Sequence, residues 1–181
     1  GRFNWDDQGE TPNTMFAVAQ FANGQYVFFN VRNANHEGYV KEVTNRFYFE
    51  DGGKLIDGEY KSHNGSQARN VNVKKVPMTP GGAFGSFVNA CRANDPTMAN
   101  GNMYDAHYSC TLGHLMNISY RMGEKVPFNA KAVDQADYIV GPWLEFDGAT
   151  EFFVGDRSVE ANRLLFDPRR SEFDLPSPDK V

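Results

Sequence analysis

The sequence predicts an α+β fold, with a largely antiparallel open mixed sheet and two to four helices on one face. Strand-like segments occupy residues 14–76, whereas helical periodicity dominates residues 79–122. Such separation of strands from helices along the chain is typical of this class. Phenylalanine is abundant, at 15 of 181 residues, which suits a sheet with a broad apolar face. The length allows one domain with a substantial core, so we expect a single domain over residues 1–181.

The first part of the chain is predicted to form strands. Residues 14–21 and 25–32 indicate a hairpin joined at Asn23-Gly24, because this dipeptide accepts the positive φ angles of a type I′ turn. Both faces of residues 14–21 are apolar, which predicts burial by helices on one face and by another subunit on the other. Apolar or alternating runs predict three further strands, at residues 46–50, 54–60 and 70–76.

Helical signals follow the strands. Thr79-Pro80 is a favourable helix start, since threonine caps helices and proline at the first helical position loses no needed donor. A long helix is expected near residues 103–122, ended by Gly123 as its cap and closely packed at Gly113. The spacing i, i+3, i+4, i+7 predicts that the earlier helix buries a stripe made of Phe84, Phe87, Val88 and Cys91.

The last third of the chain is expected to mix short elements. A short helix is predicted at residues 130–139, a strand at 151–154, and a final helix at 156–166 capped by Asp156. The two cysteines, Cys91 and Cys110, both fall in helical segments. We expect them to be buried thiols rather than a disulfide.

Composition and motif content narrow the classes of function. The net charge is −5 with both signs scattered, and without a basic stripe nucleic acid is not an expected partner. The apolar runs are too short to predict a membrane span. None of the 17 glycines forms a G-x-G-x-x-G motif, and no H-E-x-x-H or paired C-x-x-C motif is present. The sequence therefore predicts no nucleotide or zinc motif of these kinds.

The segment HYSCTLGHLMNISYRMG, residues 107–123, divides into two unlike helical faces. One face is mostly apolar and carries Tyr104, Tyr108, Leu112, Leu115, Ser119 and Met122. The other is mostly polar and carries His107, Cys110, Thr111, His114 and Arg121, with Ile118 among them. A polar face of this kind predicts either a functional site or a polar seam against another domain.

Three interpretations of this polar face remain open: a packing seam, contact with a substrate or cofactor, and a metal site. Imidazole and thiolate are zinc ligands, and a metal here would imply a metal-dependent lyase or isomerase. However, His107 and His114 are two helical turns apart, about 10 Å, which is too far for both to reach one ion comfortably. The spacing therefore favours the packing and substrate interpretations.

The segment WDDQGETPNT, residues 5–14, crowds three carboxylates and an indole ring before the first strand. Carboxylates beside an aromatic ring suit the hydroxyl groups and ring faces of a sugar. The alternative is a solvated loop that leads into the strand. Glycoside hydrolysis would need one desolvated carboxylic acid, which an exposed acidic loop does not supply.

Three segments together resemble one protein family. They are WDDQGETPNT at 5–14, HYSCTLGHLMNISYRMG at 107–123 and FFVGDRSVEANRLL at 152–165, and the ending FDPRRSEFDLP at 166–176 fits the same pattern. This set resembles the C-terminal α/β domain of bacterial oxidoreductases of the Gfo/Idh/MocA family, named for glucose–fructose oxidoreductase and inositol dehydrogenase. Residues 124–150, in contrast, match the family pattern poorly and look like an insertion.

The resemblance implies a sheet with helices on one face, which borders the substrate cleft, and an exposed face that mediates oligomers. It also implies NAD or NADP as cofactor and a sugar or polyol as substrate. The family's Gly-rich fingerprint, its E-K-P lysine and its Asp…His motif do not occur here, and they belong upstream of the segment that matches residue 1. We therefore expect no catalytic, cofactor-binding or metal-ligating residue in this chain.

The sequence thus predicts the substrate-binding and oligomerisation domain of an NAD(P)-dependent oxidoreductase, inactive alone, whose partners are a Rossmann domain outside this chain and further copies of itself. The candidate substrate-binding residues are Trp5, Asp6, Asp7, Glu10, His107 and His114. The alternative is a stand-alone carbohydrate-binding or assembly module without redox activity.

Overall fold

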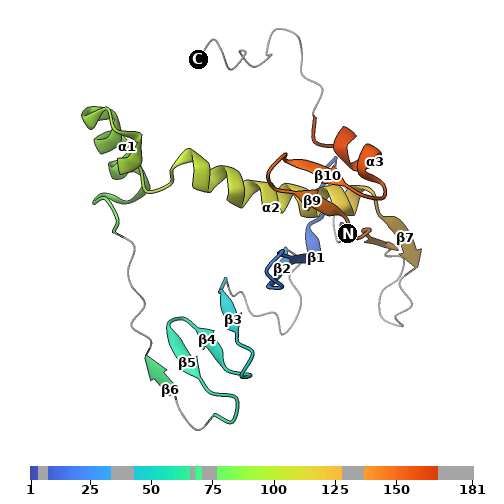
Figure 1. The fold of residues 1–181 in the computed structure, drawn as a ribbon, viewed down its shortest axis with the longest axis horizontal. Coiled ribbons are helices and arrows are strands. Elements are labelled where there is room, and N and C mark those ends of the chain that lie inside the picture. Colours follow the sequence, from blue (N-terminus) through green and yellow to red (C-terminus); the bar gives the residue numbers. More distant parts are fainter. Residues whose placement is uncertain (4–7, 34–42, 66–67, 71–76, 128–136, 167–181) are drawn as a thin grey trace. The chain divides into compact units, whose positions relative to one another are not determined.

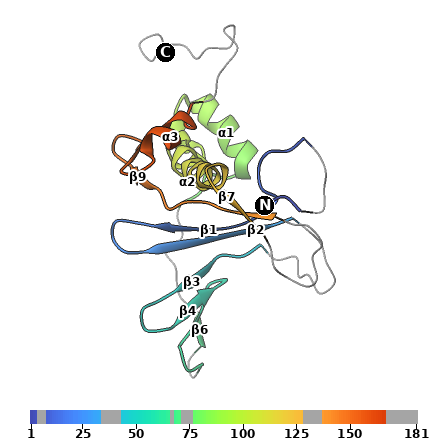
Figure 2. The same ribbon diagram turned by 90° about the vertical axis from the view of Figure 1, so that its right-hand side faces the viewer.

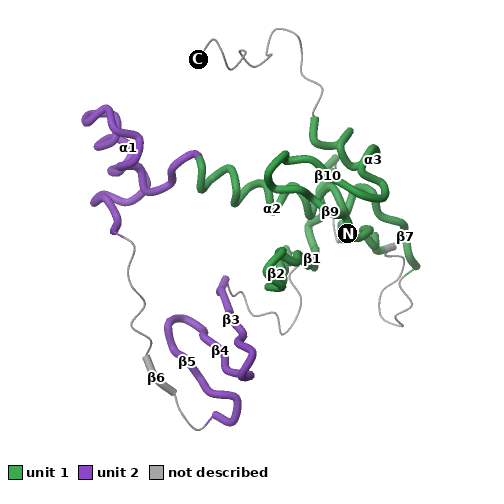
Figure 3. Tube along the Cα trace, viewed as in Figure 1, with its two compact units in different colours: residues 1–34, 104–181 green, residues 35–103 purple. Residues whose placement is uncertain are grey.

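The protein is described by a computed structural model, which covers residues 1–3, 8–33, 43–65, 68–70, 77–127 and 137–166 (Figure 1). The chain divides into two compact units, residues 1–34 with 104–181, and residues 35–103 (Figure 3). The predicted α+β class is confirmed: the described residues contain α-helices and short sheets, and every strand pair in them is antiparallel.

The first unit places a long helix next to a β-hairpin and a small group of strands and a helix. Figure 2 shows helix α2 above the hairpin β1–β2, with β9 beside α2 and α3 above and to the left of it. The pairs β1–β2, β7–β8 and β9–β10 each form a separate two-stranded sheet. The elements are β1 (Thr14–Gln20), β2 (Tyr26–Arg32), α2 (Met103–Arg121), β7 (Glu124–Pro127), β8 (Asp137–Val140), β9 (Glu145–Asp147), β10 (Phe152–Val154) and α3 (Ser158–Arg163).

The first hairpin is confirmed, but its predicted turn is wrong. Gln20 pairs with Tyr26, and the amide of Gly24 donates to the Phe21 carbonyl at 2.9 Å. Gly24 has a φ of 84°, whereas Asn23 is not left-handed. The connection is therefore a three-residue loop with glycine at its left-handed position, and not a type I′ turn.

The core of the first unit lies between α2, β10 and α3. Its buried residues are Ile118, Met122, Phe153 and Ala161, and Leu115, Leu144, Phe146, Leu164 and Leu165 pack around them. Full burial of a large apolar side chain contributes about 1.5–3 kcal/mol. Ile118, grouped with the polar face in the sequence, is thus a core residue, whereas Tyr104 and Tyr108, predicted to belong to the apolar face, are exposed. Leu115 and Met122 of the predicted apolar face do lie in the core, so the predicted division of faces is wrong at Ile118 and at the exposed Tyr104 and Tyr108.

The roles predicted for two glycines, Gly113 within α2 and Gly123 after its end, are wrong. Gly113 has open space beside it rather than a close neighbour. Gly123 is not left-handed and does not form the predicted cap. Instead, a Cβ at Gly123 would lie 2.7 Å from the Val140 carbonyl oxygen, so glycine here allows the main chain of β8 to approach the end of α2.

Side chains also tie the last helix to its neighbours. The Asn162 Oδ1 atom accepts from the Phe153 amide at 2.8 Å, and its Nδ2 donates to the Phe153 carbonyl at 2.9 Å. Arg157 donates to the Met122 carbonyl at 3.3 Å, near the end of α2. Helix α3 is preceded by Arg157, in the left-handed region, without a side-chain cap, so the predicted capping by Asp156 is wrong.

The second unit contains a four-stranded antiparallel meander, β3 (Arg46–Tyr48), β4 (Lys54–Ile56), β5 (Glu59–Lys61) and β6 (Ala68–Asn70). The predicted strand over residues 54–60 is wrong, because the chain reverses at Asp57-Gly58. Both residues have positive φ, 49° and 81°, and Ile56 pairs with Glu59 across them. The type I′ turn expected in the first hairpin thus occurs here.

The helical part of the second unit comprises α1 (Gly82–Ala93) and the short 3₁₀ helix η1 (Pro96–Met98). The helix starts after Gly81, so Thr79 does not cap it. Instead, the Thr79 amide and carbonyl both hydrogen-bond to the side chain of Asn100, each at 2.8 Å. The residues of α1 that are buried are Ser86 and Ala90.

The predicted stripe of α1 and the predicted thiols are exposed. Phe84, Phe87 and Val88 all face solvent, contrary to the prediction, and Cys91 and Cys110 are free and exposed rather than buried. None of the helices in the described part of the chain combines the length and apolar character needed to span a bilayer.

Two further predictions fall partly outside the described residues. The expected helix at 130–139 is wrong for residues 137–139, which belong to β8, and residues 130–136 are not described. Most of the expected strand at 70–76 also lies outside the described residues, although its first residue ends β6. The strand expected at 151–154 is confirmed as β10.

Candidate functional site

The predicted substrate-binding residues divide into two groups. Trp5, Asp6 and Asp7 lie outside the described residues, so their prediction stays open. Glu10, His107 and His114 are described, and all three are exposed. Within the described ranges, His107 hydrogen-bonds to Glu151, a residue that the sequence analysis does not single out.

His107 and Glu151 form a close pair on the surface of the first unit. His107 lies in the first half of α2, and Glu151 ends the turn between β9 and β10, 44 residues later. The His107 Nε2 and Glu151 Oε1 atoms are 2.6 Å apart, and their side chains are 51% and 48% exposed. At this exposure a ligand can reach the pair, and solvent screens its charges.

The turn that carries Glu151 is organised by Asp147. One carboxylate oxygen of Asp147 accepts from the Thr150 hydroxyl at 2.7 Å and the other from the Ala149 amide at 3.0 Å. These hydrogen bonds, chiefly that of Thr150, lower the pKa of Asp147. The Glu151 amide also donates to the Asp147 carbonyl at 2.8 Å. Asp147 thereby fixes the backbone from which Glu151 reaches α2.

The surroundings of His107 combine polar and aromatic groups. The Tyr108 ring meets the imidazole edge-on, with 5.5 Å between the ring centroids. His114 and Cys110 are also exposed on α2. Among the residues that the structure describes, no group of three histidine, cysteine or acidic side chains is arranged to hold a metal ion.

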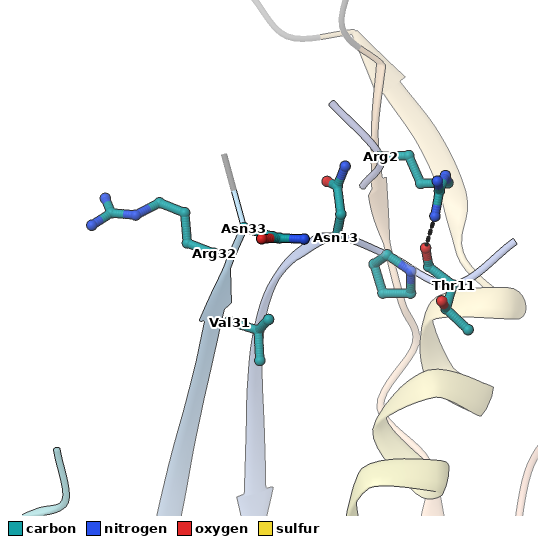
Figure 4. Close-up of a pocket in the computed structure, with 7 residues that line it drawn as sticks. Arg2, Thr11, Asn13, Val31, Arg32 and Asn33 are labelled. Carbon is teal, nitrogen blue, oxygen red and sulfur yellow. Dashed lines mark hydrogen bonds between the residues drawn. The ribbon is translucent and has the colours of Figure 1, made fainter. Parts of the chain in front are cut away.

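An open hollow of the first unit lies where the N-terminal segment meets the hairpin (Figure 4). It has a volume of about 550 Å³ and is lined by Arg2, Thr11, Pro12, Asn13, Val31, Arg32 and Asn33. Arg2 donates to the Thr11 carbonyl at 2.7 Å, whereas the Arg32 side chain points away from Arg2 in Figure 4. Guanidinium and amide groups of this kind suit the oxygen atoms of hydroxyl or carboxylate groups.

Local hydrogen bonds shape this hollow. The Asn13 side chain accepts from the Phe3 amide at 3.0 Å and donates to the Phe3 carbonyl at 2.8 Å. It therefore holds the N-terminal segment beside the start of β1. The sequence prediction identified the acidic residues of this segment but missed Arg2 and Asn13. Asn13 belongs to the segment WDDQGETPNT, and its place there is the signal that could have identified it.

An aromatic surface lies on one face of the first hairpin, and we call Phe16, Tyr26 and Phe28 the aromatic face. The Phe16 and Phe28 rings stack with centroids 6.0 Å apart, and Phe28 stacks on Tyr26 at 6.4 Å. Phe16 and Phe28 are 65% and 63% exposed. Exposed aromatic clusters of this kind are typical of surfaces that bind a partner.

Comparisons with protein-family models, with curated proteins and with solved structures found no match to this chain.

Proposed function

We propose that this chain is the substrate-binding and oligomerisation domain of an NAD(P)-dependent oxidoreductase that acts on a sugar or polyol. A Rossmann domain would supply the nicotinamide cofactor and the proton-transfer groups, so this chain alone is inactive. The proposal rests on three sequence segments that resemble, in order, the C-terminal domain of the Gfo/Idh/MocA family.

The geometry of α2 supports the substrate-binding part of the proposal. The central resembling segment forms this helix, and its His107 and His114 are exposed, with His107 paired to a carboxylate. Imidazole and carboxylate groups exchange hydrogen bonds with the hydroxyl groups of a polyol. This paired, exposed histidine is the single observation that carries the assignment of α2 to the substrate wall.

The oligomerisation part of the proposal rests on the aromatic face of β1–β2. Large exposed rings on a sheet surface lose apolar contact with water when a second copy covers them. In the proposal, this face is the one through which copies of the chain associate.

The test uses the complete polypeptide that includes the Rossmann domain, with NAD or NADP and a panel of sugars and polyols. We expect formation of reduced nicotinamide with at least one of them, and none with residues 1–181 alone. Loss of activity on replacing His107 and His114 by alanine, with retained cofactor binding, would support the α2 wall. Turnover of a sugar by residues 1–181 with added dinucleotide would contradict the proposal.

The second candidate is a stand-alone carbohydrate-binding or assembly module. The observation that favours it is the stacked aromatic face, since rings on a strand surface suit sugar ring faces as well as protein partners. The reading frame that precedes residue 1 separates the two candidates. A Gly-rich turn followed by E-K-P supports the oxidoreductase, whereas an unrelated domain supports the module.

A further inference from the structure

The short contact between His107 and Glu151 indicates which nitrogen of the imidazole carries the hydrogen. A carboxylate oxygen accepts hydrogen bonds and has no proton of its own to donate. At 2.6 Å from Glu151 Oε1, the Nε2 atom of His107 must therefore be the nitrogen that carries the hydrogen. In neutral imidazole only one ring nitrogen is protonated, so Nδ1 is then the acceptor of the ring.

The backbone of Glu151 has a defined conformation in the turn between β9 and β10. Its φ is 57°, in the left-handed region that is rare for residues other than glycine, asparagine and aspartate. The Asp147 turn holds this conformation through the Glu151 amide. The Glu151 side chain therefore extends toward α2 from a backbone that this hydrogen bond fixes.

The geometry points to Glu151 as a positioning residue for His107: it holds the imidazole in the Nε2–H form, so that Nδ1 accepts a hydrogen bond from a substrate hydroxyl. This inference rests on the proposed function, in which α2 forms part of the substrate wall. Carboxylates that hydrogen-bond to a histidine set the tautomer and orientation of metal-binding imidazoles in the same way. The ligand class is a polyol, because hydroxyl groups supply the donor that Nδ1 requires.

The experiment reads the tautomer directly, by nuclear magnetic resonance of the imidazole nitrogens in the protein labelled with ¹⁵N-histidine. The complete polypeptide is measured at alkaline pH, where imidazoles are neutral. We expect His107 in the single Nε2–H form in the wild type. Glu151→Gln offers both a donor and an acceptor, so it should leave a mixture of tautomers, and Glu151→Asp should restore part of the preference.

A matched control separates this effect from general surface charge. Glu160→Gln removes a carboxylate of similar exposure that pairs with Arg157 at 2.9 Å instead of with a histidine. We expect it to leave the His107 tautomer unchanged. A mixture of tautomers in the wild type, or an unchanged tautomer in Glu151→Gln with a preserved backbone spectrum, would overturn the inference.

Titration with glucose and with myo-inositol tests the role in binding. The resonances of His107 should shift in the wild type, with affinity about threefold to tenfold weaker in Glu151→Gln, as expected for loss of one oriented hydrogen bond. If the polyol shifts other residues but leaves His107 unmoved, the inference fails while the proposed function survives. If no resonance responds to any polyol of the panel, both fail.

Discussion

Two asparagine side chains in this protein take the place of a main-chain hydrogen-bonding partner. Asn162 bonds to both the amide and the carbonyl of Phe153, so its side chain continues the hydrogen-bonding pattern beside β10. Asn13 does the same for Phe3. These residues belong to two of the segments on which the proposed function rests. Their presence there therefore has a physical reason that is independent of substrate binding.

Replacement of Asn162 by alanine should destabilise the first unit by about 1–3 kcal/mol, because two main-chain groups beside the core lose their partners. Urea denaturation followed by circular dichroism measures this change. Asn162→Asp should be at least as destabilising, since a carboxylate keeps the acceptor but sets an oxygen against the Phe153 carbonyl. Asn30→Ala, at an exposed position of β2, is the control. Equal stability of Asn162→Ala and Asn30→Ala would refute the role of Asn162.

The lowered pKa of Asp147, again a property of a single residue, predicts that the stability of the fold depends on pH. Its hydrogen bonds from Thr150 and Ala149 lower its pKa below the ordinary value of 3.8. A lowered pKa in the folded state means that the stabilisation is present above the ordinary value and is lost as pH falls through the folded value. Denaturation midpoints between pH 5 and pH 2 should therefore fall more steeply in the wild type than in Asp147→Asn.

Asn at position 147 keeps an acceptor for the Ala149 amide but removes the titrating charge, so the turn is retained. Thr150→Ala provides a second variant, because it removes the largest cause of the lowered pKa. It should reduce the steepness of the acid limb as well. Identical profiles for the three proteins would show that Asp147 contributes nothing to acid stability.

At the scale of elements, α2 shows how one helix serves two purposes. Its second half supplies Ile118 to the core, and Met122 follows directly after its last residue. Its first half carries His107 and Tyr108, which are exposed. Hydrophobic burial thus holds one end of the helix and leaves the other end accessible. This division is what makes the exposed histidine available to a ligand in the proposed function.

Gly113 lies between these halves and is open to solvent. Gly113→Ala should stabilise the protein by about 0.5–1 kcal/mol, because alanine is the better helix former and meets no neighbour. Gly58→Ala is the counterpart: it also has open space, but its φ of 81° should cost about 1–2 kcal/mol. Thermal denaturation distinguishes the two signs. Destabilisation by Gly113→Ala would instead indicate a closely packed neighbour, as the sequence predicts.

At the scale of the whole molecule, the aromatic face predicts self-association. The double variant Phe16→Ser, Phe28→Ser should shift the protein toward monomer without unfolding it, since both rings are exposed. Size-exclusion chromatography with light scattering measures the mass. Phe84→Ser, on the exposed side of α1, is the matched control. A wild-type protein that is monomeric at every concentration would contradict the proposed oligomer.

The local sequence was sufficient to predict the fold class and the positions of several elements. The hairpin of β1 and β2, the extent of α2 and the strand β10 follow from periodicity and turn residues within short windows. Predictions that concerned contacts between distant segments failed more often. The buried side of α1 is Ser86 and Ala90 rather than its apolar stripe, which no local pattern indicates.

The sequence by itself therefore determined the α+β class, the first hairpin and the chemical character of α2, because these depend on residues close in the chain. Only the tertiary structure decided that Ile118 lies in the core, that β8 approaches Gly123 closely, and that Glu151 contacts His107. The physical reason is that each of these contacts depends on how an entire turn or helix packs. Side-chain pairing across 44 residues has no signal in any short window of the chain.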